Sequence, residues 1–253
     1  MSGNSSGPTV PVTDSVEWVN QCYDHEGRHE HVSLYLLRAP GGTVLIDSGS
    51  FYHREAITEA VDAATGGAGP DAIVLSHSDY PHAANVGPLG GATEDVELVA
   101  SSASPAQQGL PEARKCDIGG SMTVEGRRLS FIDPPLADRS HTTWIYDHAD
   151  GVLFTADGFG NYHDPGQCDY RSGEFPDATP AEAIRAYHED NLVWLRYVDP
   201  AKVEAALDRI FEAYDVRAVA PIHGNPIEGD DLDTYRDRLA DAMAAIADDY
   251  TVE

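Results

Sequence analysis

The sequence predicts one α/β domain in which two stacked β-sheets lie between two layers of helices, an αββα sandwich. Two observations favour this class: a β-rich region and a helix are followed by a second β-rich region and then helices, and no repeat or Pro/Gly-rich linker divides the chain. The chain has 253 residues, of which 42% are hydrophobic, enough for a substantial core. We therefore expect a single domain over residues 14–253, after a Gly/Ser/Pro-rich disordered tail over residues 1–13.

The first half of the chain is expected to form mainly strands. Alternating or continuous apolar residues predict strands over 16–19, 31–38, 43–47, 72–75 and 96–100. A helical spacing of apolar residues covers 54–64 and ends at the glycine-rich segment 66–70.

The second half combines strands with three long helices. Apolar runs predict strands over 129–133, 142–146, 152–155 and 216–221. Helical spacing after Pro or Asp signals predicts helices over 181–196, 201–214 and 232–247.

The charge of the chain is its most unusual bulk property. Asp and Glu number 43 against 16 Lys and Arg, which gives a net charge of -27. This resembles the proteins of salt-loving archaea, because at molar salt the Debye length falls to about 3 Å and self-repulsion is screened. We predict that the protein loses structure in low salt. A polyanionic surface also argues against a nucleic-acid partner, since phosphate binding needs clustered Lys and Arg.

No apolar run approaches the roughly 18 residues of a membrane helix, so we expect no membrane association. The N-terminal segment lacks the basic and apolar stretches of an export signal, which favours a cytoplasmic location.

Three cysteines are scattered along the chain without a CxxC motif: Cys22, Cys116 and Cys168. Their odd number and wide spacing favour three reduced thiols over a disulfide framework or a Cys-rich zinc site.

Histidines and aspartates gather where predicted strands end. Strand ends open into loops, where a rigid sheet can hold metal ligands from distant parts of the chain around one ion. The residues at these positions are Asp47, His77, Asp79, His82, His141, Asp157 and His223. Any one of them is more often an ordinary turn, surface or core residue. Their joint occurrence, as HxDxxH, a His, an Asp after an apolar strand and then Ile-His-Gly, favours a metal site.

Other histidines and tyrosines are interpreted more simply. We assign His25, His53, His148 and His188 to ordinary structural positions. Six further residues could line a pocket, although an ordinary loop or core position is favoured for each: His29, His31, Tyr80, Tyr146, Tyr162 and His163.

The ordered set of strand-end ligands resembles the metallo-β-lactamase superfamily over nearly the whole chain. Within it, the chain most resembles the diiron domain of flavodiiron proteins and the stand-alone oxygen-binding diiron proteins. Asp79 stands where zinc hydrolases of this fold usually have His. The segments LFTADGFG (153–160) and APIHG (220–224), and the region 187–203, are also similar to that branch.

The resemblance implies a metallo-β-lactamase αββα four-layer sandwich that binds two metal ions. It implies His77, Asp79 and His141 as ligands of one ion, His82 and His223 as ligands of the other, and Asp157 as the bridge. Asp47 would orient these ligands through hydrogen bonds.

One departure concerns the second ion. The family has a carboxylate ligand before the last His of the motif, where this chain has Pro81, and Asp79 is one methylene shorter than the family's Glu. Three alternatives therefore remain: the second ion binds with an extra water, it binds weakly, or the protein holds a single ion.

The metal and the reaction remain open between three hypotheses. A set of four His and two carboxylates without thiolate suits iron, zinc or manganese, and the carboxylate at Asp79 favours iron. The first hypothesis is binding or reduction of dioxygen, peroxide or nitric oxide. Because no flavodoxin domain follows, this chain would bind no flavin, and a separate flavoprotein or rubredoxin would supply electrons. The second is a zinc-dependent hydrolase acting on an ester, thioester or similar bond. The third is a binding or scaffold protein with a degraded site. A homodimer is also open.

Overall fold

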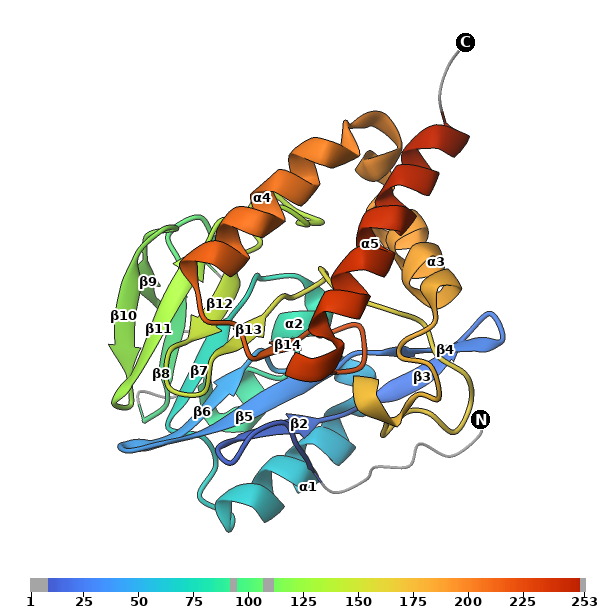
Figure 1. Cartoon of the computed structure of the whole chain (residues 1–253). Helices are drawn as coiled ribbons and strands as arrows, with labels where there is room; N and C mark the ends of the chain where they lie inside the picture. Colours follow the sequence, from blue (N-terminus) through green and yellow to red (C-terminus); the bar gives the residue numbers. More distant parts are fainter. Residues whose placement is uncertain (1–8, 92–94, 107–111, 251–253) are drawn as a thin grey trace.

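Two β-sheets lie face to face at the centre of the computed structural model, which describes residues 9–91, 95–106 and 112–250 (Figure 1). The first sheet contains, in spatial order, β1 (Val10–Pro11), β2 (Val16–Val19), β5 (Leu34–Ala39), β6 (Gly42–Ile46), β7 (Ala72–Leu75), β8 (Glu97–Ser101) and β9 (Arg114–Cys116). The second contains β10 (Ser121–Val124), β11 (Arg127–Ile132), β12 (Trp144–Asp147), β13 (Val152–Phe154), β14 (Ala218–Ala220) and β15 (Ile227–Glu228). A separate hairpin pairs β3 (Cys22–His25) with β4 (Arg28–His31).

Helices cover the outer faces of both sheets (Figure 1). Helix α1 (Arg54–Thr65) packs on the first sheet, and the second is covered by α3 (Ala181–Asn191), α4 (Pro200–Ala213) and α5 (Gly229–Asp249). The short helix α2 (Tyr80–Ala83) follows β7. Helix α1 ends at Gly66, whose φ of 67° is the left-handed conformation that glycine adopts without a steric penalty.

Three apolar layers hold the sandwich together, and β5 shows how the sequence builds two of them. Leu34 and Leu36 belong to the layer that includes Ile57 of α1, whereas Tyr35 and Leu37 belong to the layer between the sheets. This follows the period of two along a strand, and complete burial of each such side chain contributes about 1.5–3 kcal/mol. A third layer joins the second sheet to α3, α4 and α5. The expected four-layer αββα fold is confirmed.

Several predicted boundaries shift in the structure. The strand expected over 31–38 divides into the end of β4 and all of β5, and the helix expected over 181–196 is α3 followed by the 3-10 segment Val193–Tyr197. The disorder expected over residues 1–13 is wrong for Val10–Pro11, which pairs with β2. Residues 1–8 of that segment lie outside the described residues.

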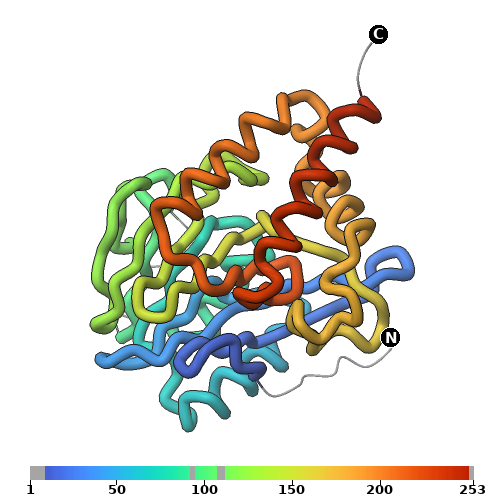
Figure 2. The backbone as a smooth tube through the Cα atoms, viewed as in Figure 1, coloured from blue at the N-terminus to red at the C-terminus, as the bar shows by residue number. Residues whose placement is uncertain are grey.

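The prediction of three reduced thiols is also wrong. Cys22 and Cys168 form a disulfide with a Cα–Cα distance of 6.1 Å, and Cys116 alone is free. The partners are 146 residues apart in sequence and meet only because the β3–β4 hairpin lies beside the segment that follows β13, as Figure 2 shows in blue and yellow. Spacing along the chain carries no information on such a pair.

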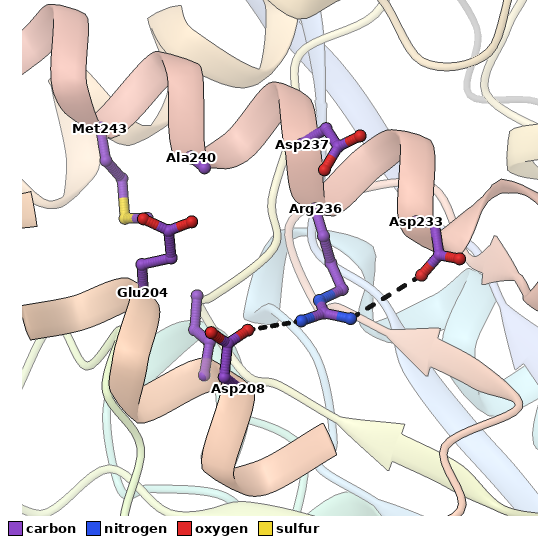
Figure 3. A pocket seen from close by; sticks show the side chains of 8 residues that line it. Glu204, Asp208, Asp233, Arg236, Asp237, Ala240 and Met243 are labelled. Atoms are coloured by element: carbon purple, nitrogen blue, oxygen red, sulfur yellow. Dashed lines mark hydrogen bonds and ion pairs between the residues drawn. The ribbon is translucent and has the colours of Figure 1, made fainter. Parts of the chain in front are cut away.

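Helices α4 and α5 border an acidic surface groove of the second helical layer (Figure 3). Arg236 of α5 reaches Asp208 of α4 at 2.7 Å and Asp233 at 3.7 Å. The same groove is lined by Glu204 and Asp237. Four carboxylates around one guanidinium leave a net negative field here, as expected from the charge of the chain. Among the described residues, no helix is long and apolar enough to cross a membrane.

Candidate metal centre

Loops at the ends of neighbouring strands bring the predicted ligands together. Asp47 follows β6, and His77, Asp79 and His82 follow β7, which is parallel to β6. In the second sheet, Asp157 follows β13 and His223 follows β14, and these strands are also parallel neighbours. Because neighbouring parallel strands have their carboxyl ends at the same edge of a sheet, the ligands that follow them lie close together at that edge. His141 precedes β12 and completes the predicted set.

The Asp157 carboxylate lies between His77 on one side and His82 and His223 on the other. Its Oδ1 is 3.4 Å from Nε2 of His223 and 3.7 Å from Nε2 of His82, and these two nitrogens are 3.4 Å apart. Its Oδ2 is 3.5 Å from Nε2 of His77. Each oxygen therefore faces different imidazoles, as in a carboxylate that bridges two ions. The ligand atoms of His77, His82 and Asp157 also lie within 4.8 Å of one another, as the ligands of a single ion do.

These separations fit ligands that share an ion. Two ligands about 2.1 Å from one ion, at angles between octahedral and tetrahedral, lie about 3.0–3.4 Å apart. The observed separations of 3.4–3.7 Å are at or slightly above this range. Moreover, Nε2 of His77, Nε2 of His141 and Oδ2 of Asp157 are buried without a hydrogen-bond partner. Buried polar atoms are rarely left unpaired, so these residues fit a bound metal.

The remaining predicted ligands lie at the more open side of the centre. Nε2 of His141 is 3.4 Å from Oδ1 of Asp79, and their side chains are 22% and 29% exposed. The other oxygen of Asp79 accepts a hydrogen bond from Nε of Arg139 at 2.8 Å. Asp138, which sequence reasoning missed, places Oδ1 3.8 Å from Nε2 of His77 and forms a candidate ligand group with His77 and Asp79.

Two carboxylates orient the histidines from behind. Oδ2 of Asp47 is 2.8 Å from Nδ1 of His82, and the same carboxylate accepts hydrogen bonds from the backbone N–H and hydroxyl of Ser76, each at 2.7 Å. Asp47 adopts a left-handed φ of 62°, which is costly for a residue with a Cβ and persists only where its contacts hold it. The role of Asp47 in orienting metal ligands stays a prediction, and these contacts are the ones through which it would act.

The second orienting carboxylate, Glu30, was also missed. Oε1 of Glu30 is 3.0 Å from Nδ1 of His223, and Oε2 accepts a hydrogen bond from the Tyr23 hydroxyl at 2.9 Å. Glu30 is 4% exposed although it lies in the polar strand sequence RHEH. A charged residue among polar neighbours gives no sequence signal of burial, and only the fold reveals it.

Tyr187 supports the Asp157 loop. Its hydroxyl donates to the Asp157 carbonyl oxygen at 3.0 Å. Its ring passes so close to Gly160 that a Cβ there would lie 2.1 Å from a ring carbon. This contact explains why residue 160 is glycine, because a larger residue would displace the Tyr187 ring that holds the loop.

The charges at the centre shift several pKa values. Burial, assisted by neighbouring His82, lowers the pKa of His77 to about 3. Burial would also lower the pKa of His82, but the carboxylates of Asp157 and Asp47 outweigh it and raise that pKa to about 10. Burial opposes ionisation of Asp157, yet the nearby His82 and His223 hold its pKa below the usual range. Without metal, a proton on His82 therefore compensates the buried carboxylates.

Pro81 occupies the first turn of α2, where a missing backbone N–H costs nothing. It offers no side-chain ligand to the group formed by His82, His223 and Asp157. Glu30 does not replace that ligand, because it contacts the outer nitrogen of His223.

Most of the other histidines and tyrosines lie away from the centre. The Tyr146 hydroxyl donates to the Asp215 carbonyl, and Tyr80 is 54% exposed. His29 and His163 form a separate group with the two bonded cysteines, and the His31 ring stacks on His163 at 4.2 Å.

Comparisons with known proteins agree on the fold. The model of the metallo-beta-lactamase superfamily matches residues 27–207. A mutant of the flavo di-iron protein from Thermotoga maritima superimposes with a TM-score of 0.77 at 17% identity, covering 95% of this chain and 62% of that one. The rubredoxin oxygen:oxidoreductase of Desulfovibrio gigas gives 0.67 at 16% identity, covering 95% and 61%.

A flavoprotein fragment from Nostoc gives a TM-score of 0.71 at 17% identity and covers 96% of this chain and 97% of the fragment. The chain thus spans about three fifths of the two longer proteins and nearly all of the shorter one. No curated protein sequence matches the chain. At these identities the structural likeness shows the fold, which is that of the flavodiiron core. With the family model matched over most of its length, the chain belongs to the metallo-β-lactamase superfamily.

Proposed function

We propose that this protein holds two metal ions, iron in preference to zinc or manganese, and binds or reduces dioxygen, peroxide or nitric oxide with electrons from a separate partner. The observation that carries the proposal is the Asp157 carboxylate, with one oxygen facing His82 and His223 and the other facing His77. The absence of thiolate from this group, and its mixture of imidazole and carboxylate, suit iron.

Residues from four loops, at the ends of strands of both sheets, would hold the ions. His77, Asp79 and His141 would bind the first ion, and Asp138 is an additional donor on that side. His82 and His223 would bind the second ion, and Asp157 would bridge the two.

A bound iron pair would exchange electrons with a small ligand. None of the described side chains at this centre supplies such redox chemistry. The chain itself orients the donors: Asp47 and Glu30 each fix the Nδ1 side of an imidazole, so that Nε2 faces the centre. Arg139, 59% exposed, pairs with Asp79 and Asp138 and offsets part of their negative charge at the open side.

The second ion would be held by fewer protein donors than the first. His82, His223 and Asp157 supply three, and Pro81 supplies none. We therefore expect the second ion to bind more weakly, with solvent completing its coordination.

The electron donor is part of the proposal. One similar protein is named as a rubredoxin oxygen:oxidoreductase and another as a flavo di-iron protein. We infer that a separate flavoprotein or rubredoxin supplies electrons to this chain. A cytoplasmic location and a homodimer belong to the same proposal.

Metal content and spectra of the full chain, purified without oxygen at high salt, test this function. His223→Ala should reduce the content from about two ions per chain to about one, because it removes one of the three donors of the weaker site. His148→Ala, at an exposed histidine, is the matched control and should retain both ions. Zinc in both sites together with turnover of a thioester would instead support the hydrolase alternative.

A further inference from the structure

Two cysteines and two histidines form a second cluster, separate from the candidate metal centre. Their ligand atoms all lie within 4.8 Å of one another: Cys22, His29, His163 and Cys168. Nδ1 of His29 is 3.6 Å from Sγ of Cys22 and 3.3 Å from Sγ of Cys168. Nε2 of His163 is 3.5 Å from Sγ of Cys168. Neither the fold class nor the proposed function requires this convergence.

The distances match the edges of a tetrahedral zinc site. With Zn–S of about 2.3 Å and Zn–N of about 2.0–2.1 Å, tetrahedral angles place nitrogen and sulfur ligands about 3.6 Å apart and two sulfurs about 3.8 Å apart. The three nitrogen–sulfur distances of 3.3–3.6 Å agree with this geometry. The sulfur pair departs from it, because the two sulfurs are joined in a disulfide.

The backbone holds these four residues in place. The register of β3 and β4 pairs Cys22 with His31 and Asp24 with His29, so Cys22 and His29 lie on the same face of the hairpin. His29 and His163 exchange two backbone hydrogen bonds, of 2.8 and 3.0 Å. These bonds fix the hairpin against the segment that carries His163 and Cys168 (Figure 2). The positions of the four residues thus do not depend on the disulfide alone.

We propose that reduction of the Cys22–Cys168 disulfide converts this cluster into a tetrahedral binding site for a soft divalent cation, with Zn²⁺ preferred. A water-soluble phosphine can supply the two electrons: the S–S bond breaks, water provides two protons and its oxygen, and two thiols and a phosphine oxide result. Metal binding then releases the two thiol protons to solvent, because the thiolate is the ligand. The oxidised and metal-bound forms of the cluster exclude each other.

The composition of the cluster favours zinc and distinguishes it from the first centre. Two thiolates and two imidazoles supply a complete tetrahedral shell, as in structural zinc sites. The candidate metal centre offers imidazoles and carboxylates without thiolate, so thiolate ligation reports the new site alone. The two sites are neighbours through β4, where His29 faces the cluster and the adjacent Glu30 contacts His223 of the metal centre.

Cobalt titration of the full chain at high salt tests the proposal, because Co²⁺ bound by thiolates gives near-ultraviolet charge-transfer bands that His/Asp ligation does not give. Phosphine-reduced protein, exchanged anaerobically into metal-free buffer, should show these bands with a final intensity equal to about one thiolate-bound Co²⁺ per chain, and Zn²⁺ should remove them. The oxidised protein should show none. Cys168→Ser should lose the bands, whereas Cys116→Ser, at the cysteine outside the cluster, should keep them.

A second measurement on the unmutated chain avoids dependence on variants that fold poorly. Zn²⁺ should slow iodoacetamide alkylation of reduced Cys22 and Cys168 by about tenfold or more, mapped by mass spectrometry, and leave Cys116 unchanged. The proposal is overturned if the reduced, folded chain shows neither thiolate–cobalt bands nor protection. Bands of equal strength in folded Cys168→Ser would also overturn it.

Discussion

Replacing Glu30 by glutamine tests how the chain supports the second metal ion. Glu30 is buried, with Oε1 3.0 Å from Nδ1 of His223 and Oε2 2.9 Å from the Tyr23 hydroxyl. Glutamine has nearly the same shape, but its single amide oxygen can accept from Tyr23 or face His223, not both. The substitution therefore removes the negative charge and one of the two acceptor oxygens behind His223 and Tyr23.

The expected effect is a loss of affinity at one of the two ions. A hydrogen bond to a charged group contributes about 1.5–3 kcal/mol, which corresponds to about 10–100-fold in a dissociation constant. Removal of a carboxylate that orients a metal-binding histidine has consequences of the same size. Glu30→Gln should therefore lower the affinity for the second ion by about 10–100-fold and change the affinity for the first ion by less than about threefold.

Competition with a chromophoric chelator, under anaerobic conditions at high salt, measures both affinities. The matched control is Glu17→Gln, which removes the same charge from a partly buried residue that pairs with Arg38. Because the chain is so acidic, only a change of equal charge makes this comparison fair. Unchanged affinity for the second ion in folded Glu30→Gln would refute the reasoning, as would an equal loss in Glu17→Gln.

Four further predictions concern the second ion, the core and the charge. Pro81→Asp places a carboxylate before His82 and should raise the affinity for the second ion by about tenfold or more in the same competition assay. Unchanged affinity would contradict the role given to this position. Arg127→Met leaves Asp147, whose Oδ2 lies 2.5 Å from the Arg127 guanidinium, buried without its countercharge, and should lower the free energy of unfolding by about 3–5 kcal/mol in urea titrations; a loss below about 1 kcal/mol would count against it. Burial lowers the pKa of His188 to about 4, so below pH 6.5 the unfolded chain takes up a proton that the folded chain does not, and stability falls as pH drops from 6.5 to 4. His188→Leu should remove up to about 3 kcal/mol of that fall, and equal pH dependence in both proteins would exclude this cause. Finally, circular dichroism after dialysis to millimolar salt should show loss of structure, and an unchanged spectrum would contradict the interpretation of the acidic surface.

The sequence predicted the layers of the fold because each layer has a local pattern. Strand β5 alternates between two apolar layers, and the continuous apolar β7 is buried along its whole length. The spacing of apolar residues in α4 and α5 indicated two helices that each bury one face. Short polar strands such as β4, with the sequence RHEH, carry no such pattern and emerge only from pairing in the folded chain.

The same distinction applies to the candidate centre. His77 and His82 follow an apolar strand within one short motif, so their proximity could be predicted from sequence. Glu30, in strand β4, and Asp138, in the loop before β12, approach the centre only when the chain folds, and no spacing links them to their histidine partners. The Cys22–Cys168 pair was missed for the same reason.

Metal analysis of the full chain, purified without oxygen at high salt and combined with its absorption spectrum, tests the central claim most directly. We expect about two irons per chain, with the second lost first on dialysis against a chelator, and an absorption band near the ultraviolet edge after exposure to oxygen. Zinc as the only metal, with thioester turnover, would contradict the redox function. A folded chain that binds no metal at His77, His82, Asp157 and His223 would contradict the metal centre itself.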